Sequence, residues 1–165
     1  SGQKQIRMED LKVLYESLGL AQAETYVQSG NVIFESAGQD QASLASLIEG
    51  GINKALGYDV TVLIRAPEDF RRLVESNPFL TDRIEDPAAL YVTFLLGPPA
   101  DPALKHPDSG RDSFSMAGCE VFVFCPDGYG RTRLSNAFFE RKLKTPATTR
   151  NWKTVTALNE MAQSR

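Results

Sequence analysis

Cysteine and histidine are scarce in this sequence. Its 165 residues include two cysteines and a single histidine, His106, which lies in a proline-rich stretch. If residues 119–125 form one strand, Cys119 and Cys125 are roughly 20 Å apart, too far for a disulfide. A metal site needs more ligands close together, so neither a bound metal nor a disulfide is expected.

Several functional motifs are absent as well. The sequence contains no G-x-x-x-x-G-K-[ST] loop, no G-x-G-x-x-G before a helix and no nucleophile elbow. No window approaches the run of about 20 apolar residues that spans a membrane. The opening SGQKQIRMED lacks the apolar core of a secretory signal. We therefore expect a cytoplasmic globular protein without a cofactor and without membrane contact.

Charge is distributed unevenly along the chain. The formal net charge is −3, yet residues 129–155 carry seven Arg and Lys side chains against the single Glu140. That region is therefore strongly basic, and the rest of the chain is acidic. A basic region on an acidic body favours a partner that carries phosphate groups, including nucleic acid.

Residue patterns in the first half predict three helices and three strands. The expected order is a helix over 7–18, strands over 25–28 and 32–35, a helix over 40–56, a strand over 60–65 and a helix from 67 to before 77. Ser29-Gly30-Asn31 suits the tight turn of a hairpin. Asp40 and Gly57 are expected to cap the two ends of the middle helix.

The second half repeats this order with one strand more. The expected elements are a strand over 90–96, a helical turn near 102–105, strands over 113–116 and 120–125, a helix over 134–143, a strand over 147–150 and a helix over 151–162. The order β-α-β-β-α-β is the ferredoxin-like motif. We predict an α+β protein of two tandem ferredoxin-like units, residues 1–78 and 79–165, each with an appended helix. The first strand is missing from the first unit.

Two long motifs resemble a known family. TYVQSGNVIFES in the first half, and YGRTRLSNAFFERKL followed by PATTRNWKTV in the second, are similar to domain-of-unknown-function family sixteen ninety-seven, which is mainly bacterial. The resemblance implies a duplicated ferredoxin-like α/β fold. It also implies an opening strand and a glycine-containing loop that would precede Ser1. It implies no activity and no catalytic residue.

The start of the last predicted helix is the first candidate site. A helix start presents free N–H groups and a partial positive charge, so Arg150 and Lys153 are mildly unfavourable there. A bound phosphate or carboxylate would reverse that penalty. The candidate ligand-binding residues here are Thr148, Thr149, Arg150 and Asn151. The alternative is a capped helix whose Arg150 pairs with a carboxylate of the fold.

The basic segment before this strand is the second candidate. Arg131, Arg133 and Asn136 precede Arg141, Lys142 and Lys144, and together they would form a patch able to hold phosphates if they share a face with Arg150. The alternative is a solvated helix face. Phe122 and Phe124, on one face of a strand, are expected to be core residues rather than a base-stacking platform.

Three functions remain open from these patterns. The first is an anion-binding module for a nucleotide, a phosphorylated metabolite or nucleic acid. The second is an enzyme acting on a phosphorylated or carboxylated small molecule, although no general base stands out. The third is a protein-interaction domain that uses sheet edges or the basic patch. The sequence does not decide between enzyme and binding protein, and it leaves the oligomeric state open.

Overall fold

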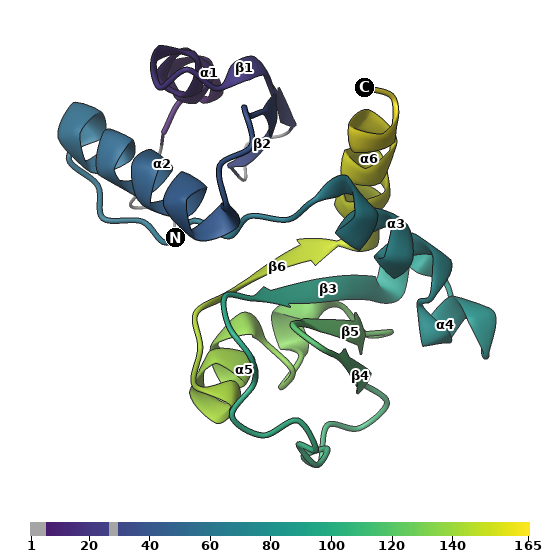
Figure 1. The fold of residues 1–165 in the computed structure, drawn as a ribbon. Coiled ribbons are helices and arrows are strands. Elements are labelled where there is room, and N and C mark those ends of the chain that lie inside the picture. Colours follow the sequence, from purple (N-terminus) through teal and green to yellow (C-terminus); the bar gives the residue numbers. More distant parts are fainter. Residues whose placement is uncertain (1–5, 27–29) are drawn as a thin grey trace. The chain divides into compact units, whose positions relative to one another are not determined.

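Two compact units make up the chain in this computed structural model, which describes residues 6–26 and 30–165 (Figure 1). The first unit comprises residues 1–66 together with 164–165, and the second comprises residues 67–163. Both units combine helices with an antiparallel sheet. The predicted α+β class is therefore confirmed.

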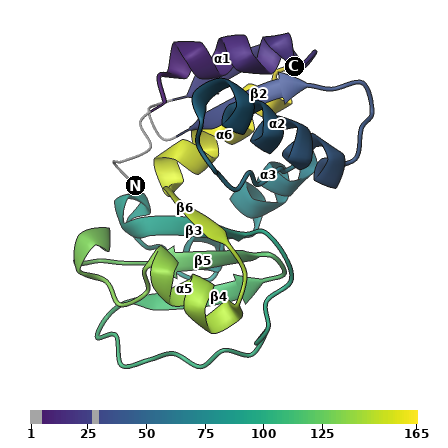
Figure 2. The ribbon, with the colours of Figure 1, turned by 90° about the vertical axis from the view of Figure 1, so that its left-hand side faces the viewer.

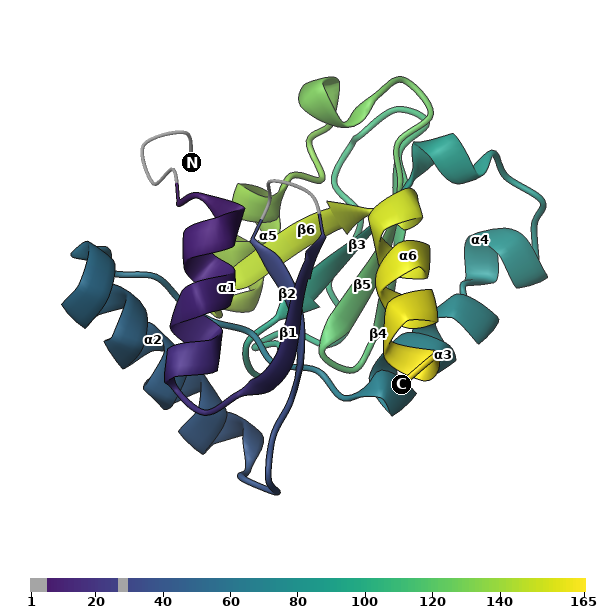
Figure 3. The ribbon, with the colours of Figure 1, turned by 90° about the horizontal axis from the view of Figure 1, so that it is seen from above.

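The first unit packs two helices against a hairpin. Its elements are α1 (Met8–Ser17), β1 (Ala21–Tyr26), β2 (Asn31–Glu35) and α2 (Gln41–Leu56). Strands β1 and β2 are antiparallel, and α1 lies alongside them in Figure 3. Apolar side chains from all four elements face one another, so helices and hairpin share a single core. Its buried members are Leu11, Tyr15, Leu20, Ala23, Leu44, Ile48 and Ile52.

Both predicted caps of α2 are confirmed. The Asp40 carboxylate accepts a hydrogen bond from the Ser43 amide at 2.8 Å, which satisfies one of the free N–H groups of the first turn. Gly57 ends the helix with φ at 75°, a left-handed conformation that glycine adopts without a steric penalty. The hydrogen bonds from Ser43 to Asp40 also hold the pKa of this carboxyl below its ordinary value.

Two strand predictions in the first half need correction. Strand β1 begins at Ala21 rather than at residue 25, and its pairing with β2 is irregular between Ala21 and Glu24. Residues 60–65 are extended but join no sheet within the described part of the chain. A β-branched pattern becomes a strand only where a second backbone supplies hydrogen bonds. The predicted turn residue Ser29 and the predicted strand end at 27–28 lie outside the described residues.

The second unit contains four strands and four α-helices among the described residues. These are α3 (Pro67–Glu75), α4 (Pro78–Thr81), β3 (Leu90–Leu95), β4 (Ser113–Ala117), β5 (Glu120–Phe124), α5 (Asn136–Leu143), β6 (Ala147–Asn151) and α6 (Trp152–Gln163). Helix α3, which the sequence pattern groups with the first half, packs against α6 here (Figure 1). Within residues 6–26 and 30–165, no helix has the length and apolar character needed to cross a membrane.

The four strands form one antiparallel sheet in the order β4-β5-β3-β6. Strand β3 is central, with Val92 opposite Phe122 of β5 on one side and opposite Arg150 of β6 on the other. The predicted hairpin of β4 and β5 and the predicted short strand β6 are thereby confirmed. Helix α5 begins at Asn136, two residues later than the sequence pattern predicts.

Helices cover both faces of this sheet. Figure 2 shows α5 in front of the strands, where Phe139 and Leu143 join a cluster that includes Val121 and Val123 of β5. On the opposite face, the ring of Phe70 in α3 lies 5.6 Å from that of Phe94, and α4 stacks a second phenylalanine on β5. Burial on both faces explains why β3 and β5 are almost continuously apolar.

Residues 102–103 form a turn, but the helical turn predicted near 102–105 does not develop into a helix. Residues 97–112 instead run as an irregular connection from β3 to β4. Prolines in this stretch supply no N–H groups for a helix interior. The connection is fastened to the end of α5, because the Ala100 amide donates to the Leu143 carbonyl at 3.0 Å. Leu104 of this connection packs at the margin of the core under α5. In a helical connection, an apolar side chain of that helix would take this place.

Two adjacent glycines inside α2 provide a stability test. A Cβ at Gly50 would meet nothing within 4 Å, whereas one at Gly51 would lie 2.9 Å from Leu18 Cδ1. Gly50→Ala should therefore raise the free energy of unfolding by about 0.5–1 kcal/mol, the difference in helix propensity. Gly51→Ala should gain less, because the Leu18 side chain has to move. Urea unfolding of both variants measures this, and equal gains would contradict the predicted contact.

Candidate functional site

At the start of α5, side-chain oxygens accept hydrogen bonds from backbone N–H groups that have no acceptor within the helix. Ser135 Oγ accepts a hydrogen bond from the Phe138 amide at 3.2 Å. The Tyr129 hydroxyl accepts one from the Asn136 amide at 2.7 Å. Two of the N–H groups that a helix start leaves free are therefore occupied. The segment thus presents few free donors for an anion at this end.

Asn136 and Thr149, both predicted ligand-binding residues, are brought together by the fold. Thr149 Oγ1 donates to Asn136 Oδ1 at 2.9 Å and lies 2.8 Å from the hydroxyl of the buried Thr93. Asn136 Nδ2 donates to the Ala147 carbonyl at 3.0 Å. These bonds join α5 to strands β3 and β6. Both side chains therefore form hydrogen bonds within the protein.

Thr148 and Arg150 lie on the other face of the sheet from Thr149, because side chains alternate along a strand. Arg150 Nη1 donates to Thr148 Oγ1 at 2.6 Å and to the Thr149 carbonyl at 3.0 Å. Burial lowers the pKa of the Arg150 guanidinium from its ordinary value. The strand therefore divides the predicted Thr-Thr-Arg group between two faces.

Asn151 acts at the start of α6. Its Oδ1 accepts a hydrogen bond from the Thr154 amide at 2.8 Å, so it fills the position of a helix cap. Trp152 and Val155 of the same helix are buried. The capped-helix alternative of the sequence analysis thus describes Asn151 and Trp152 in the structure.

Arg133 contacts the long connection over 97–112, whereas Arg131 lies near Asp127, which follows β5. Arg133 Nη1 donates to the Asp108 carbonyl at 3.1 Å. Asp127 accepts a hydrogen bond from Arg111, which lowers the pKa of the carboxyl, and the charge of Arg131 adds to this effect. The two predicted arginines therefore lie near residues 108 and 127.

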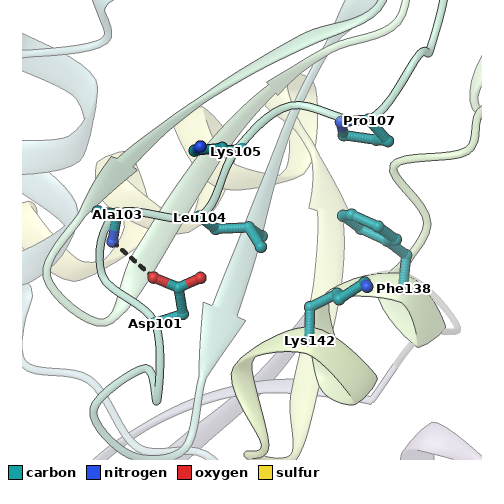
Figure 4. Close-up of a pocket in the computed structure, with 7 residues that line it drawn as sticks. All are labelled: Asp101, Ala103, Leu104, Lys105, Pro107, Phe138 and Lys142. Atoms are coloured by element: carbon teal, nitrogen blue, oxygen red, sulfur yellow. Dashed lines mark hydrogen bonds between the residues drawn. The ribbon is translucent and has the colours of Figure 1, made fainter.

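A hollow of about 450 Å³ lies between the long connection and α5 (Figure 4). We call it the loop–α5 hollow, and its lining residues are Asp101, Ala103, Leu104, Lys105, Pro107, Phe138 and Lys142. Leu104 and Phe138 provide apolar surface, and Lys105 and Lys142 provide two positive charges. Arg141 adds a third cation nearby, its Cζ lying 5.7 Å from the centre of the Phe138 ring.

The charges of the loop–α5 hollow are only partly balanced. Asp101 is the one carboxylate among its lining residues, and its Oδ1 accepts a hydrogen bond from the Ala103 amide at 3.2 Å (Figure 4). Within the described chain, neither Lys105 nor Lys142 forms an ion pair. The lining thus carries a net positive charge beside an apolar wall.

Sequence reasoning did not consider Lys105 and Leu104, which line the loop–α5 hollow, and treated Lys142 only as part of a helix face. The signal present in the sequence was the long stretch 97–112, the one connection too long for a tight turn. The face of α5 that this stretch covers is decided by how the sheet folds, so it could not be predicted from residue spacing.

Other chemistry is not supported by the described residues. No group of three or more His, Cys, Asp or Glu side chains among them could hold a metal ion. Burial raises the pKa of the Cys125 thiol to about 11, which keeps it protonated and poorly nucleophilic at neutral pH. His106 accepts a hydrogen bond from the Phe114 amide at 3.2 Å and stacks on the Phe114 ring. The environments of the Cys125 thiol and the His106 imidazole therefore indicate structural roles.

Comparison with known proteins identifies the family. The chain belongs to the family described as Protein of unknown function (DUF1697), whose model matches residues 1–122. The resemblance predicted from the sequence is confirmed, and the match ends before the basic segment. No curated protein matches the chain. Conserved bacterial protein SP0830 from Streptococcus pneumoniae is similar in fold, with a TM-score of 0.71 at 24% identity over 96% of this chain and 90% of that chain.

Proposed function

We propose that the protein is a binding module for a small anion, which it takes in the loop–α5 hollow. The observation that carries this proposal is the pair Lys105 and Lys142, which line the same hollow without an ion pair among the described residues. Two ammonium groups that share a concavity raise the local concentration of anions. Phosphate and carboxylate groups are the natural counter-ions for such a pair.

The size and lining of the hollow favour a small ligand. A volume of about 450 Å³ lies within the range of pockets for small molecules, roughly 300–1,000 Å³. Leu104 and the ring of Phe138 would contact the apolar part of the ligand, and the lysines would bind its charged end. A phosphorylated or carboxylated metabolite fits this division, whereas nucleic acid requires a longer basic track.

The residues predicted from the sequence take different parts in this proposal. We assign Arg131 and Arg133 to the positive field around the second unit rather than to direct contact. Asn136 and Thr149 join α5 to the sheet, and Asn151 caps α6. Thr148 and Arg150 bond to each other on the opposite face. Ligand contact is therefore proposed for Lys105 and Lys142 first.

The test compares two lysines in matched positions. Lys142 lies in the last turn of α5, and Lys54 lies in the last turn of α2 in the first unit. Both substitutions by glutamine lose a charge at a helix C-terminus, at a similar small cost. A panel of inorganic phosphate, nucleotides and short carboxylic acids would be titrated by thermal shift and calorimetry. Lys142→Gln should weaken binding of the best ligand about tenfold, which is about 1.4 kcal/mol.

Three results would count against the proposal. The panel could fail to shift the melting temperature, or Lys142→Gln could bind as well as Lys54→Gln. A third contrary result is binding of RNA or DNA that weakens steeply with salt, because released counterions mark contacts to a phosphate backbone. A small-anion site would show a shallower dependence on salt.

We also propose that the two units derive from one repeated ferredoxin-like arrangement. The order β4-β5-β3-β6, antiparallel throughout, supports this for the second unit. Along the chain each hairpin is followed by a helix, an extended segment and another helix, although the helix after residues 60–65 is α3 of the second unit. The first unit differs in having no counterpart of the central strand β3 within its described residues.

A further inference from the structure

The lining of the loop–α5 hollow carries charges of both signs. In Figure 4 the Lys142 side chain extends toward the Phe138 ring, whereas Asp101 lies away from that ring, beside the start of the connection. Arg141 adds a further cation beside Phe138. The Leu104 side chain lies between Asp101 and the aromatic ring in this view. The hollow therefore has a cationic end at Phe138, an apolar middle and a carboxylate at its other end.

The Asp101 carboxylate is held in place without using its full bonding capacity. The Ala100 amide donates to the Leu143 carbonyl at 3.0 Å, which fastens this part of the connection to the end of α5. Asp101 Oδ1 accepts a hydrogen bond from the Ala103 amide at 3.2 Å, in a turn that asparagine forms as well as aspartate. Within the described chain, Oδ2 forms no hydrogen bond. The turn therefore requires neither the second oxygen nor the negative charge.

The surroundings of Asp101 favour a positively charged partner. Carbonyl groups at the C-terminal end of a helix carry a partial negative charge, and the Leu143 carbonyl bonds to the residue next to Asp101. Lys105 follows by only four positions, yet Asp101 belongs to no ion pair among residues 6–26 and 30–165. A carboxylate and a helix C-terminus together stabilise a cation placed between them.

We infer that the ligand of the loop–α5 hollow is a short zwitterion, an anion whose other end carries an ammonium group. The inference rests on the proposed anion site and specifies the class of its ligand. The anionic group would bind Lys142 beside Phe138, and the ammonium group would donate to Asp101 Oδ2. A short alkyl chain between them would contact Leu104.

The spacing of the two ends limits the length of this ligand. Phe138 and Leu143 are five residues apart on α5, which is roughly 7.5 Å along the helix axis. An extended bridge of about four atoms separates two charged groups by about 6 Å, since three backbone bonds extend about 3.6 Å. Such a bridge fits, whereas the charges of a simple α-amino acid such as glycine are too close together.

The test uses pairs of compounds that differ only in the ammonium group. One pair is 3-aminopropyl phosphate and propyl phosphate, and the other is 5-aminopentanoate and pentanoate. Calorimetric titration of the full chain should show about fivefold tighter binding of the ammonium compound, the effect of a partly exposed ion pair. The pair that binds more tightly identifies the anionic group as phosphate or carboxylate. Glycine and acetate should show no such difference.

Asp101→Asn removes the charge and keeps the oxygen that accepts from Ala103. Its matched control is Asp86→Asn, because Asp86 also precedes Pro-Ala and accepts a hydrogen bond from the Ala88 amide at 3.0 Å. Asp101→Asn should abolish the fivefold preference without weakening the binding of propyl phosphate or pentanoate, and Asp86→Asn should retain it. A merely structural role of Asp101 would instead weaken both members of a pair equally.

The outcomes separate this inference from the proposed function. Equal binding within both pairs by the parent chain would overturn the inference and leave the anion site intact. A preference that persists in Asp101→Asn would also overturn it. Binding of none of these compounds would overturn the anion site and the inference with it. If Asp101→Asn does not fold, Asp101→Ser gives the same readout, because serine also forms this kind of turn.

Discussion

Replacing Phe139 by alanine should lower the free energy of unfolding by about 3–5 kcal/mol, the usual cost of deleting a fully buried aromatic ring. Phe139 is completely buried between α5 and the sheet. Its ring meets that of Phe114 at 5.3 Å and that of Phe138 at 5.1 Å, in both cases edge to face. Alanine would leave a cavity that neighbours on a helix and two strands cannot fill by small movements.

Ile84 provides the matched control, because it is also a large apolar residue but is 97% exposed. Ile84→Ala should change stability by no more than about 0.5 kcal/mol. Chemical denaturation with fluorescence of Trp152, which belongs to the same unit, measures both variants. A loss below about 1 kcal/mol for Phe139→Ala would contradict the packing of α5 on the sheet.

Asn136→Ala should cost about 2–3 kcal/mol of stability, although the sequence pattern placed this residue in a binding site. The substitution removes the donor to the Ala147 carbonyl and the acceptor for Thr149. Each hydrogen bond contributes about 0.5–1.5 kcal/mol, and partners left unsatisfied add to the loss. The Thr149 hydroxyl would retain only Thr93 as a neighbour among the described contacts.

A double-mutant cycle distinguishes a structural role from a binding role. Asn136→Ala and Thr149→Val should be non-additive in unfolding experiments, because they remove the same interaction. Asn136→Asp keeps the acceptor for Thr149 and should cost less than alanine. Additive losses would contradict the hydrogen bond between Asn136 and Thr149. An Asn136→Ala variant with full stability and reduced anion binding would show that Asn136 is a ligand residue.

Local signals were sufficient to predict most elements of the fold. Asp40 and Gly57 cap α2 through hydrogen bonds to residues no more than four positions away, so the local sequence is enough to predict where this helix begins and ends. The apolar run of β3 reflects its burial on both faces. Residues 60–65 failed as a predicted strand because pairing depends on a second backbone, which local pattern does not report. The helix predicted near 102–105 is not formed, because residues 97–112 run as an irregular connection that is hydrogen-bonded to the end of α5.

The candidate site was harder to predict than the fold. The sequence pattern gathered Thr148, Thr149 and Arg150 into one group, but a strand turns neighbouring side chains to opposite faces. Lys105 and Lys142 lie far apart in the sequence and line the same hollow only because residues 97–112 run beside α5. Charge segregation pointed to α5, the helix that lines the proposed site. It could not predict that residues of the 97–112 connection lie opposite that helix.

The sheet edges also bear on how the protein behaves at high concentration. In the second unit both outer strands, β4 and β6, are five residues long, and they carry serine, threonine and arginine. Short polar edges of this kind resist intermolecular pairing. Strand β2 is equally short, but it pairs only with β1 among the described strands and bears the apolar residues Val32, Ile33 and Phe34. Aggregation during storage or crystallisation should therefore begin in the first unit.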